Sequence, residues 1–161
     1  MRKGFTLIEL LIVIAIIAGL AGIALITFPS AQTTARDTRR KSDLKQYASA
    51  LETFANRSNG LYPSFASDIV TSSTNNSLCT ALGLASACSF DPKDPTSQYH
   101  YVSNGTGGGS SSATQYVLYA TLERPISGSN WTWVVCSTGA AGRVAVGTSF
   151  AGGTCPNNLQ Q

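Results

Sequence analysis

Residues 3–28 read KGFTLIELLIVIAIIAGLAGIALITF, and this stretch decides how the chain is organised. From Phe5 to Phe28 its only ionisable side chain is that of Glu9. The run reaches the ~20 residues that an α-helix needs to cross a bilayer, and it is longer than the apolar region of an ordinary secretory signal. We therefore predict a transmembrane helix over residues 5–28 that stays on the mature protein.

The spelling K-G-F-T-L-I-E ahead of the apolar run resembles the N-terminal processing signal of type IV prepilins and of the pseudopilins of type II secretion. The resemblance covers residues 1–28. It implies that a prepilin peptidase removes residues 1–4 as a leader, by cutting after Gly4, and methylates the new terminal amine of Phe5. It also implies that the mature chain polymerises with copies of itself into a helical filament.

Glu9 is the one carboxylate inside the apolar run. A charge left unpaired in hydrocarbon costs several kcal/mol, so a partner is expected. The resemblance supplies one, because the cationic amine of Phe5 on a neighbouring subunit could pair with Glu9 and set the register of assembly. The alternative is that Glu9 reaches the lipid headgroups one turn into a plain anchor helix.

The sequence predicts that the helix continues as an amphipathic segment over residues 29–58. Pro29 removes a backbone donor, so a bend is expected near residues 27–30. Asn59-Gly60 supplies the stop. Apolar residues recur at helical spacing and predict one buried face: Leu44, Tyr47, Ala48, Leu51, Phe54 and Ala55. Charged residues lie off this stripe: Arg39, Arg40, Lys41, Asp43, Lys45 and Glu52. For the charges within residues 36–45 we expect a solvated helix face, and the alternative is contact with neighbouring subunits or lipid headgroups.

Residues 59–161 are predicted to form a globular head. Residues 62–94 are irregular, and alternating apolar residues over 99–147 predict an antiparallel β-meander of three or four strands, with 104–112 as a flexible hairpin loop. Such a sheet has one apolar face to cover, which the helix stripe provides. The predicted fold class is α+β, a long kinked N-terminal helix packed on a small C-terminal antiparallel sheet. The lollipop-shaped pilin fold, which the resemblance implies, has the same elements.

The chain has four cysteines and looks exported, which favours two disulfides over free thiols. Three pairings are possible. We favour Cys79 with Cys88 and Cys136 with Cys155, because each pair lies within one loop-rich segment. The spacings do not match the closely spaced pairs of a zinc site.

The sequence shows no credible catalytic set. His100 is the single histidine and has no Ser or Cys partner at motif spacing, so we predict that the protein is not an enzyme. Asp91 and Asp94 are weak candidates for a calcium site such as some pseudopilins carry, and turn initiation before Pro92 and Pro95 is the other interpretation. We therefore predict no metal site and no cofactor.

The charge of the chain gives little reason to expect that it binds nucleic acid directly. The net charge is +3, it falls to +1 if Arg2 and Lys3 leave with the leader, and the sequence does not combine a pI above ~9 with clustered basic residues as a dedicated nucleic-acid binder does. The partners that the resemblance implies are other copies of the chain, the prepilin peptidase, the inner-membrane assembly platform with its ATPase-driven machinery, and membrane lipids before assembly.

The resemblance implies a single-pass protein of the cytoplasmic membrane that becomes extracellular on assembly. Five Lys or Arg residues within 36–45 would place the head in the cytoplasm by the positive-inside rule, but the cysteines and the leader favour export. The function expected is a structural subunit of a type IV pilus-like filament, serving adhesion, twitching motility or DNA uptake. The alternative is a pseudopilin that drives protein export, since residues 58–63 (SNGLYP) and 94–101 (DPTSQYHY) resemble segments of major pseudopilins and small bacterial pilins.

Overall fold

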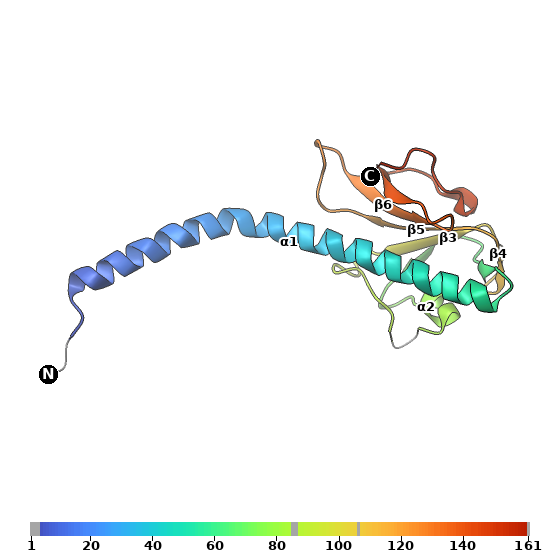
Figure 1. Cartoon of the computed structure of the whole chain (residues 1–161), viewed down its shortest axis with the longest axis horizontal. Coiled ribbons are helices and arrows are strands. Elements are labelled where there is room, and N and C mark those ends of the chain that lie inside the picture. Colours follow the sequence, from blue (N-terminus) through green and yellow to red (C-terminus); the bar gives the residue numbers. More distant parts are fainter. Residues whose placement is uncertain (1–3, 85–86, 106, 161) are drawn as a thin grey trace. The chain divides into compact units, whose positions relative to one another are not determined.

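The structure is a computed structural model of the whole chain that describes residues 4–84, 87–105 and 107–160, with the side chains of 24–27 left out. The chain divides into two compact units, Met1–Ala35 and Arg36–Gln161, and the second is termed the head. Its elements are α1 (Leu7–Arg57), β1 (Tyr62–Pro63), β2 (Ile69–Thr71), α2 (Ser77–Leu82), β3 (Tyr99–Ser103), β4 (Ser111–Ala113), β5 (Tyr116–Thr121), β6 (Trp131–Cys136), β7 (Ala141–Ala145) and a 3-10 turn at Ala151–Gly153 (Figure 1). The α+β class is confirmed, with a long N-terminal helix followed by an antiparallel sheet.

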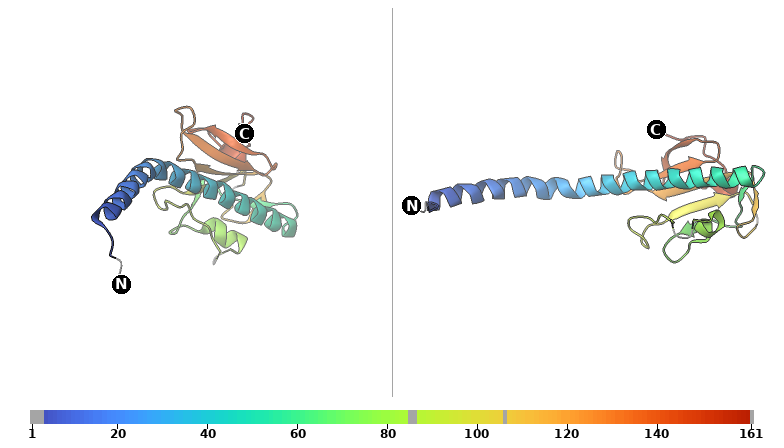
Figure 2. Two further views of the ribbon diagram at one scale, coloured as in Figure 1. Left: turned by 60° about the vertical axis from the view of Figure 1, so that its left-hand side comes forward. Right: turned by 60° about the horizontal axis from the view of Figure 1, so that its bottom comes forward.

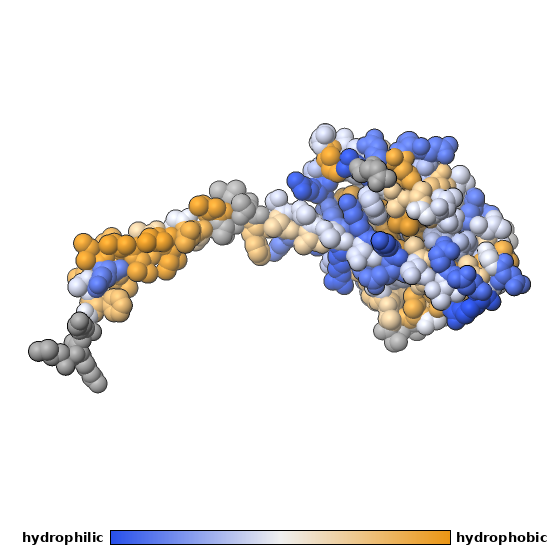
Figure 3. All heavy atoms as spheres, viewed as in Figure 1, coloured by the Kyte–Doolittle hydropathy of each residue, from blue (hydrophilic) through white to orange (hydrophobic). Residues whose placement is uncertain are grey.

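The first unit contains the N-terminal part of α1, which has no buried side. Every large apolar side chain from Leu7 to Ile23 is between 48% and 88% exposed. Figure 3 shows apolar residues over most of the visible surface of this segment. A helix that is apolar on all sides needs lipid or other helices around it. We therefore expect this apolar surface to be covered by lipid or by other helices.

The membrane-span criteria are met only weakly. No single helix among the described residues is long and apolar enough to cross a bilayer, whereas Leu7–Ile23 and Phe28–Arg57 meet the criteria together as a pair bent by 46°. The bend precedes Pro29 inside α1. A proline ring clashes with the carbonyl group four residues earlier, which explains why the bend lies ahead of Pro29.

Residues 36–57 of α1 belong to the head and pack on its sheet. The predicted stripe is confirmed, because Leu44, Tyr47 and Leu51 are buried against the tyrosines of the sheet. The helix ends at Arg57. The N–H group of Gly60 donates to the carbonyl of Ala55 over 2.9 Å, and the backbone at Asn59 and Gly60 has φ values of 54° and 79°. Asn and Gly tolerate this left-handed region best, which is why this dipeptide stops the helix.

The sheet has five antiparallel strands in the order β2-β3-β5-β6-β7, so the expected number of three or four was too low. The added strand, β2, lies inside the segment 62–94 that was predicted to be irregular. A second small sheet pairs β1 with β4, and β4 lies at the end of the predicted hairpin loop 104–112. The Ser64 and Ser112 hydroxyls bond over 2.6 Å beside this pair, so tertiary contacts hold strands that carry no apolar alternation.

Both faces of the five-stranded sheet are covered, whereas the sequence predicted cover for one. The inner face packs on α1 (Figure 2). The outer face carries Val117, Val134 and Val144, which pack against Phe150 and Leu159 of the C-terminal segment. The head therefore has two hydrophobic cores, one on each side of the sheet.

The C-terminal segment also covers the outer edge of β7. The N–H group of Arg143 donates to the carbonyl of Gln160 over 2.8 Å, and the N–H group of Gln160 donates back over 3.0 Å. A Cβ atom at Gly142 would lie 2.8 Å from the Gln160 carbonyl oxygen, so glycine is what permits this approach. The unpaired edge that a terminal strand normally presents is thus partly closed by the chain itself.

All six tyrosines of the chain have a raised pKa in the folded state. Burial is the main cause, and it raises the pKa of Tyr47 and Tyr62 to about 12. Carboxylates add to the effect, since the Tyr99 hydroxyl donates to Asp43 over 2.7 Å. A raised folded pKa stabilises the fold fully below pH ~10, and that stability is lost as the pH rises toward the folded pKa.

We therefore expect cooperative alkaline unfolding between pH ~10 and ~12, because each buried tyrosine removes about 1.4 kcal/mol of stability per pH unit above its unfolded pKa. Tyrosinate absorbance should stay absent up to pH ~10 and then rise together with the loss of the circular dichroism signal. Tyrosinate that forms gradually while the circular dichroism stays unchanged would contradict the burial of these side chains.

Candidate functional site

The N-terminus of α1 is closed by a reciprocal pair of contacts between Thr6 and Glu9. Glu9 Oε2 accepts from the backbone N–H of Thr6 over 2.8 Å and from its hydroxyl over 2.7 Å. The N–H group of Glu9 donates to the Thr6 hydroxyl oxygen over 3.3 Å. This arrangement is a capping box, in which two helix-terminal donors are satisfied at once. It also explains why α1 begins at Leu7 and not at the expected Phe5.

The capping box gives Glu9 a partner inside its own chain. Both interpretations drawn from the sequence placed that partner elsewhere, on a neighbouring subunit or in the lipid headgroups. Only Oε2 is used, and Oε1 of Glu9 has no hydrogen-bond partner among the described residues. The carboxylate can therefore hold the helix cap and accept one more donor at the same time. The pattern T-x-x-E over residues 6–9 was the sequence signal for this role.

The expected cleavage junction lies directly ahead of the capping box. Gly4 and Phe5 are exposed and outside any helix or strand, and Phe5 is 89% exposed. A Cβ atom at Gly4 would meet nothing within 4 Å. The rest of the predicted leader, residues 1–3, lies outside the described residues. The junction thus has the open backbone that a peptidase needs.

Replacement of Gly4 by leucine should leave the leader attached. The chain has room for the side chain, so the loss of processing would report recognition by the peptidase and not misfolding. Mass spectrometry of the membrane-extracted protein should show an N-terminus at Met1. Gly22→Leu is the matched control, because a Cβ atom there also meets nothing within 4 Å, and this variant should be trimmed normally. A trimmed Gly4→Leu chain would refute the cleavage assignment.

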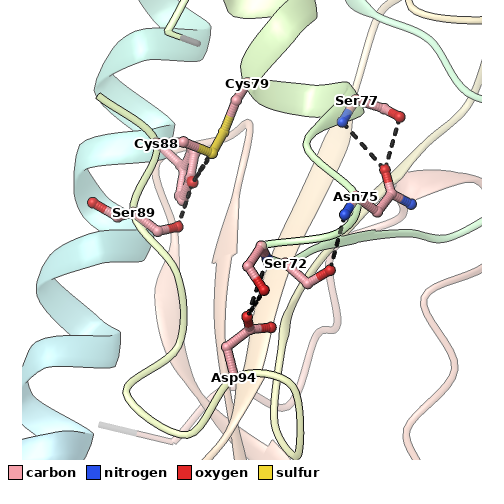
Figure 4. Close-up of a disulfide and its surroundings, with 9 residues drawn as sticks. Ser72, Asn75, Ser77, Cys79, Cys88, Ser89 and Asp94 are labelled. Carbon is pink, nitrogen blue, oxygen red and sulfur yellow. Dashed lines mark hydrogen bonds between the residues drawn. A yellow bond between two sulfur atoms is a disulfide. The ribbon is translucent and has the colours of Figure 1, made fainter. Parts of the chain in front are cut away.

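The structure contains two disulfides, Cys79–Cys88 and Cys136–Cys155, with Cα atoms 5.8 Å and 5.7 Å apart. Figure 4 shows the first of them, which ties α2 to the loop that follows it. The Tyr47 hydroxyl lies 3.2 Å from the Cys79 sulfur and donates to the Ser89 carbonyl over 2.5 Å. The second disulfide fixes the C-terminal segment to β6. No cysteine is free among the described residues.

The candidate calcium ligands are engaged by other groups. Asp91 is buried, and its two carboxylate oxygens accept from the Arg40 guanidinium over 2.6 Å and 2.8 Å. Asp94, labelled in Figure 4, accepts from the backbone N–H and the hydroxyl of Ser73 through Oδ2, and its buried Oδ1 has no hydrogen-bond partner among the described residues. Within the described ranges, no three His, Cys, Asp or Glu side chains come together as a metal site would require. His100 lies 3.0 Å from Asp68 and stacks on Tyr119.

A buried ionic network joins α1 to two loops of the head. Arg40 is fully buried and contacts Asp91, Asp37 over 2.8 Å and Glu123 over 2.6 Å. Arg36 donates twice to Glu123, over 2.8 Å and 2.6 Å. Hydrogen bonds from Arg36, followed by those from Lys93 and Arg40, hold the pKa of the Glu123 carboxyl well below its usual range. The prediction of a solvated face was therefore wrong for Arg40, and also for Asp43, which is buried.

Residues 1–25 match the family described as "Prokaryotic N-terminal methylation motif". No curated protein and no solved structure matches the chain. The matched residues include Gly4, Phe5 and both members of the capping box. The chain thus carries, at the start of an α+β pilin-like fold, the prepilin signature of type IV pilins and pseudopilins.

Proposed function

We propose that this protein is the structural subunit of a type IV pilus-like extracellular filament. The observation that carries the proposal is the methylation motif at residues 1–25 on a helix whose eleven large apolar side chains from Leu7 to Ile23 are exposed on all sides. Lipid would cover these side chains before assembly. After extraction from the membrane they need copies of the same helix, because each side chain left in water instead would cost about 1.5–3 kcal/mol.

Glu9 would set the register of that assembly. Cleavage after Gly4 leaves a cationic amine on Phe5, and a neighbouring subunit could present this amine to Oε1 of Glu9. The capping box supports this role because it holds the carboxylate in place through Oε2. A positioned acceptor loses less conformational entropy on pairing than a mobile one.

The partners and locations follow from the same proposal. The prepilin peptidase would trim and methylate the chain in the cytoplasmic membrane, and the assembly platform with its ATPase-driven machinery would extract it to the cell surface. Adhesion, twitching motility or DNA uptake would be properties of the filament. We propose no catalytic role for the chain.

Electron microscopy of surface filaments, combined with mass spectrometry of their subunit, tests the proposal. The expected result is a filament whose subunit begins at a methylated Phe5. A native protein that remains a membrane anchor with Met1 in place, and that never enters a filament, would overturn it.

A second candidate function is that of a pseudopilin in a type II secretion system. The two segments that resemble pseudopilins meet in the head, where the buried Tyr101 hydroxyl donates to the Pro63 carbonyl over 2.6 Å. Calcium dependence separates the candidates. If a chelator lowers the melting temperature of the full-length protein in detergent by many degrees, the pseudopilin function gains, and an unchanged melting temperature favours the pilus-like filament.

A further inference from the structure

The head has an open groove between α1 and the inner face of the sheet, with a volume of about 880 Å³. One wall is α1, which contributes Lys41, Lys45 and Glu52. The floor comes from β6 and β7, which contribute Trp133, Val135 and Ala141. The groove exists because the sheet is wider than the helix that covers it, so the inner face near β7 lacks the cover that β3 and β5 have.

The groove combines an aromatic floor with a basic rim. The Lys41 ammonium lies 4.3 Å from the centre of the Trp133 ring and makes a cation–π contact with it. The indole of Trp133 is only partly buried. Lys45 is exposed on the next helical turn. No carboxylate forms an ion pair with Lys41 or Lys45 among the described residues. A partner for this surface should therefore bring an acidic group together with some apolar area.

The head itself has one carboxylate suited to that need. Four of its acidic residues pair with Arg or Lys and are largely buried: Asp37, Asp43, Asp91 and Glu123. Glu52 lines the groove itself and accepts from Tyr62 and Tyr116. Asp94 has one oxygen buried and accepts from Ser73 through the other. Asp68 is the remaining acid, and its side chain is 37% exposed.

Asp68 lies on the opposite side of the sheet from the groove. Its Oδ2 accepts from the Tyr119 hydroxyl and contacts His100, and Tyr119 packs on Phe150 of the outer core. Oδ1 has no hydrogen-bond partner in the part of the chain that the structure describes. Phe65 packs edge-on against Tyr101 in the inner core, and the exposed Ala66 that follows it gives the turn of residues 66–68 a small apolar area beside the acid. One copy cannot bring this turn to its own groove across the sheet.

We propose that the groove between α1 and β6–β7 receives the turn at residues 66–68 of a second copy, with Asp68 against Lys41 and Lys45. This rests on the proposed filament function and names the surface through which neighbouring heads meet. The contact joins two different patches, so it is heterologous, and repetition leaves one free groove and one free turn at the two ends. Such a contact propagates along a filament and does not close into a dimer.

Crosslinking in assembled filaments tests the proposal. A chain carrying both Lys45→Cys and Asp68→Cys, treated with a short bis-maleimide, should give a ladder of dimers, trimers and larger species on a denaturing gel. Each single variant should stay monomeric. The chain suits this test because its native cysteines are held in disulfides. Arg124→Cys with Asp68→Cys is the matched control, since Arg124 is exposed outside the groove, and it should give no ladder.

Charge reversal gives an independent measurement of the same contact. Lys45→Glu or Asp68→Lys alone should lower filament yield by about tenfold, and the two together should restore it, because like charges repel and the reversed pair attracts again. Arg124→Glu should change the yield by no more than about twofold. The melting temperature of Lys45→Glu should match that of the wild-type protein, since this side chain is exposed and forms no ion pair among the described residues. Asp68→Lys loses the contacts with Tyr119 and His100, so its melting temperature is measured before its filament yield is compared.

Three results would overturn the proposal. The first is normal filaments in which the double-cysteine chain gives no ladder. The second is dimers from Lys45→Cys alone, which would show a symmetric contact between two grooves. The third is wild-type filament yield from both Lys45→Glu and Asp68→Lys, which would show that these two charges do not meet in the filament. A wild-type protein that makes no filaments would instead overturn the proposed function, and electron microscopy reads this outcome separately.

Discussion

Replacement of Arg40 by alanine should destabilise the folded head by about 3–5 kcal/mol, the usual result of removing one partner from a buried ion pair. Arg40 is fully buried and touches Asp37, Asp91 and Glu123. Without the guanidinium, these carboxylates would keep their charges but lose the group that holds them together. The expected fall in melting temperature is about 10–20 °C for a domain of this size.

Thermal unfolding followed by circular dichroism measures this effect in the full-length protein in detergent. Arg39→Ala is the matched control, because Arg39 is 62% exposed and lies 3.6 Å from Asp43. Exposed ion pairs contribute about 0–1 kcal/mol, so this control should melt close to the wild type. Arg40→Lys should fall between the two, since lysine keeps the charge but loses the planar fork that grips Asp91. Equal melting temperatures for Arg40→Ala and Arg39→Ala would refute the role of the network.

Replacement of Glu9 by alanine should leave the protein inserted in the membrane and trimmed after Gly4, but filament yield should fall by about a hundredfold or more. The loss corresponds to roughly 3 kcal/mol, the scale of an unpaired charge in an apolar surrounding. Here the unpaired charge would be the amine of Phe5 on the neighbouring subunit. Immunoblots of membrane and sheared filament fractions separate insertion and processing from assembly.

Glu9→Gln separates the two roles of this side chain. Glutamine can still complete the capping box with Thr6, but it carries no charge for the amine. We therefore expect Glu9→Gln to lose assembly nearly as completely as Glu9→Ala, although α1 keeps its cap. Full assembly of the glutamine variant would mean that the cap, and not the charge, is what the filament requires.

Local patterns allowed much of the fold to be predicted. The stripe through Leu44, Tyr47 and Leu51 repeats at helical spacing, and Asn59-Gly60 marks the end of α1 by its backbone preference. Strands β3, β5 and β6 carry enough apolar and aromatic residues to stand out. The strands β2 and β4 could not be predicted, because each has only three residues and depends on pairing with a strand distant in the sequence.

The features of the candidate site likewise fall into those that local sequence predicts and those that depend on contacts between distant residues. The cleavage motif and Glu9 are local, and so is the capping box, whose T-x-x-E pattern stands in the sequence at residues 6–9. The Arg40 network could not be predicted, because Arg40 and Asp91 are 51 positions apart, and Arg36 and Glu123 are 87 apart. Nothing in the neighbouring sequence tells a buried arginine from a solvated one until the loops that carry its acids have folded.

The bridge between Gln160 and Arg143 bears on how subunits behave when they are crowded together. The unpaired edge of a strand can form hydrogen bonds with the sheet of an adjacent molecule. Such lateral aggregation would compete with ordered growth. Because the C-terminal segment pairs with the edge of β7 at Arg143, fewer backbone groups of this edge remain for such aggregation. In the proposed filament, growth would then depend on the apolar surface of α1 and on the contact between heads, and the C-terminal segment would limit lateral aggregation through β7.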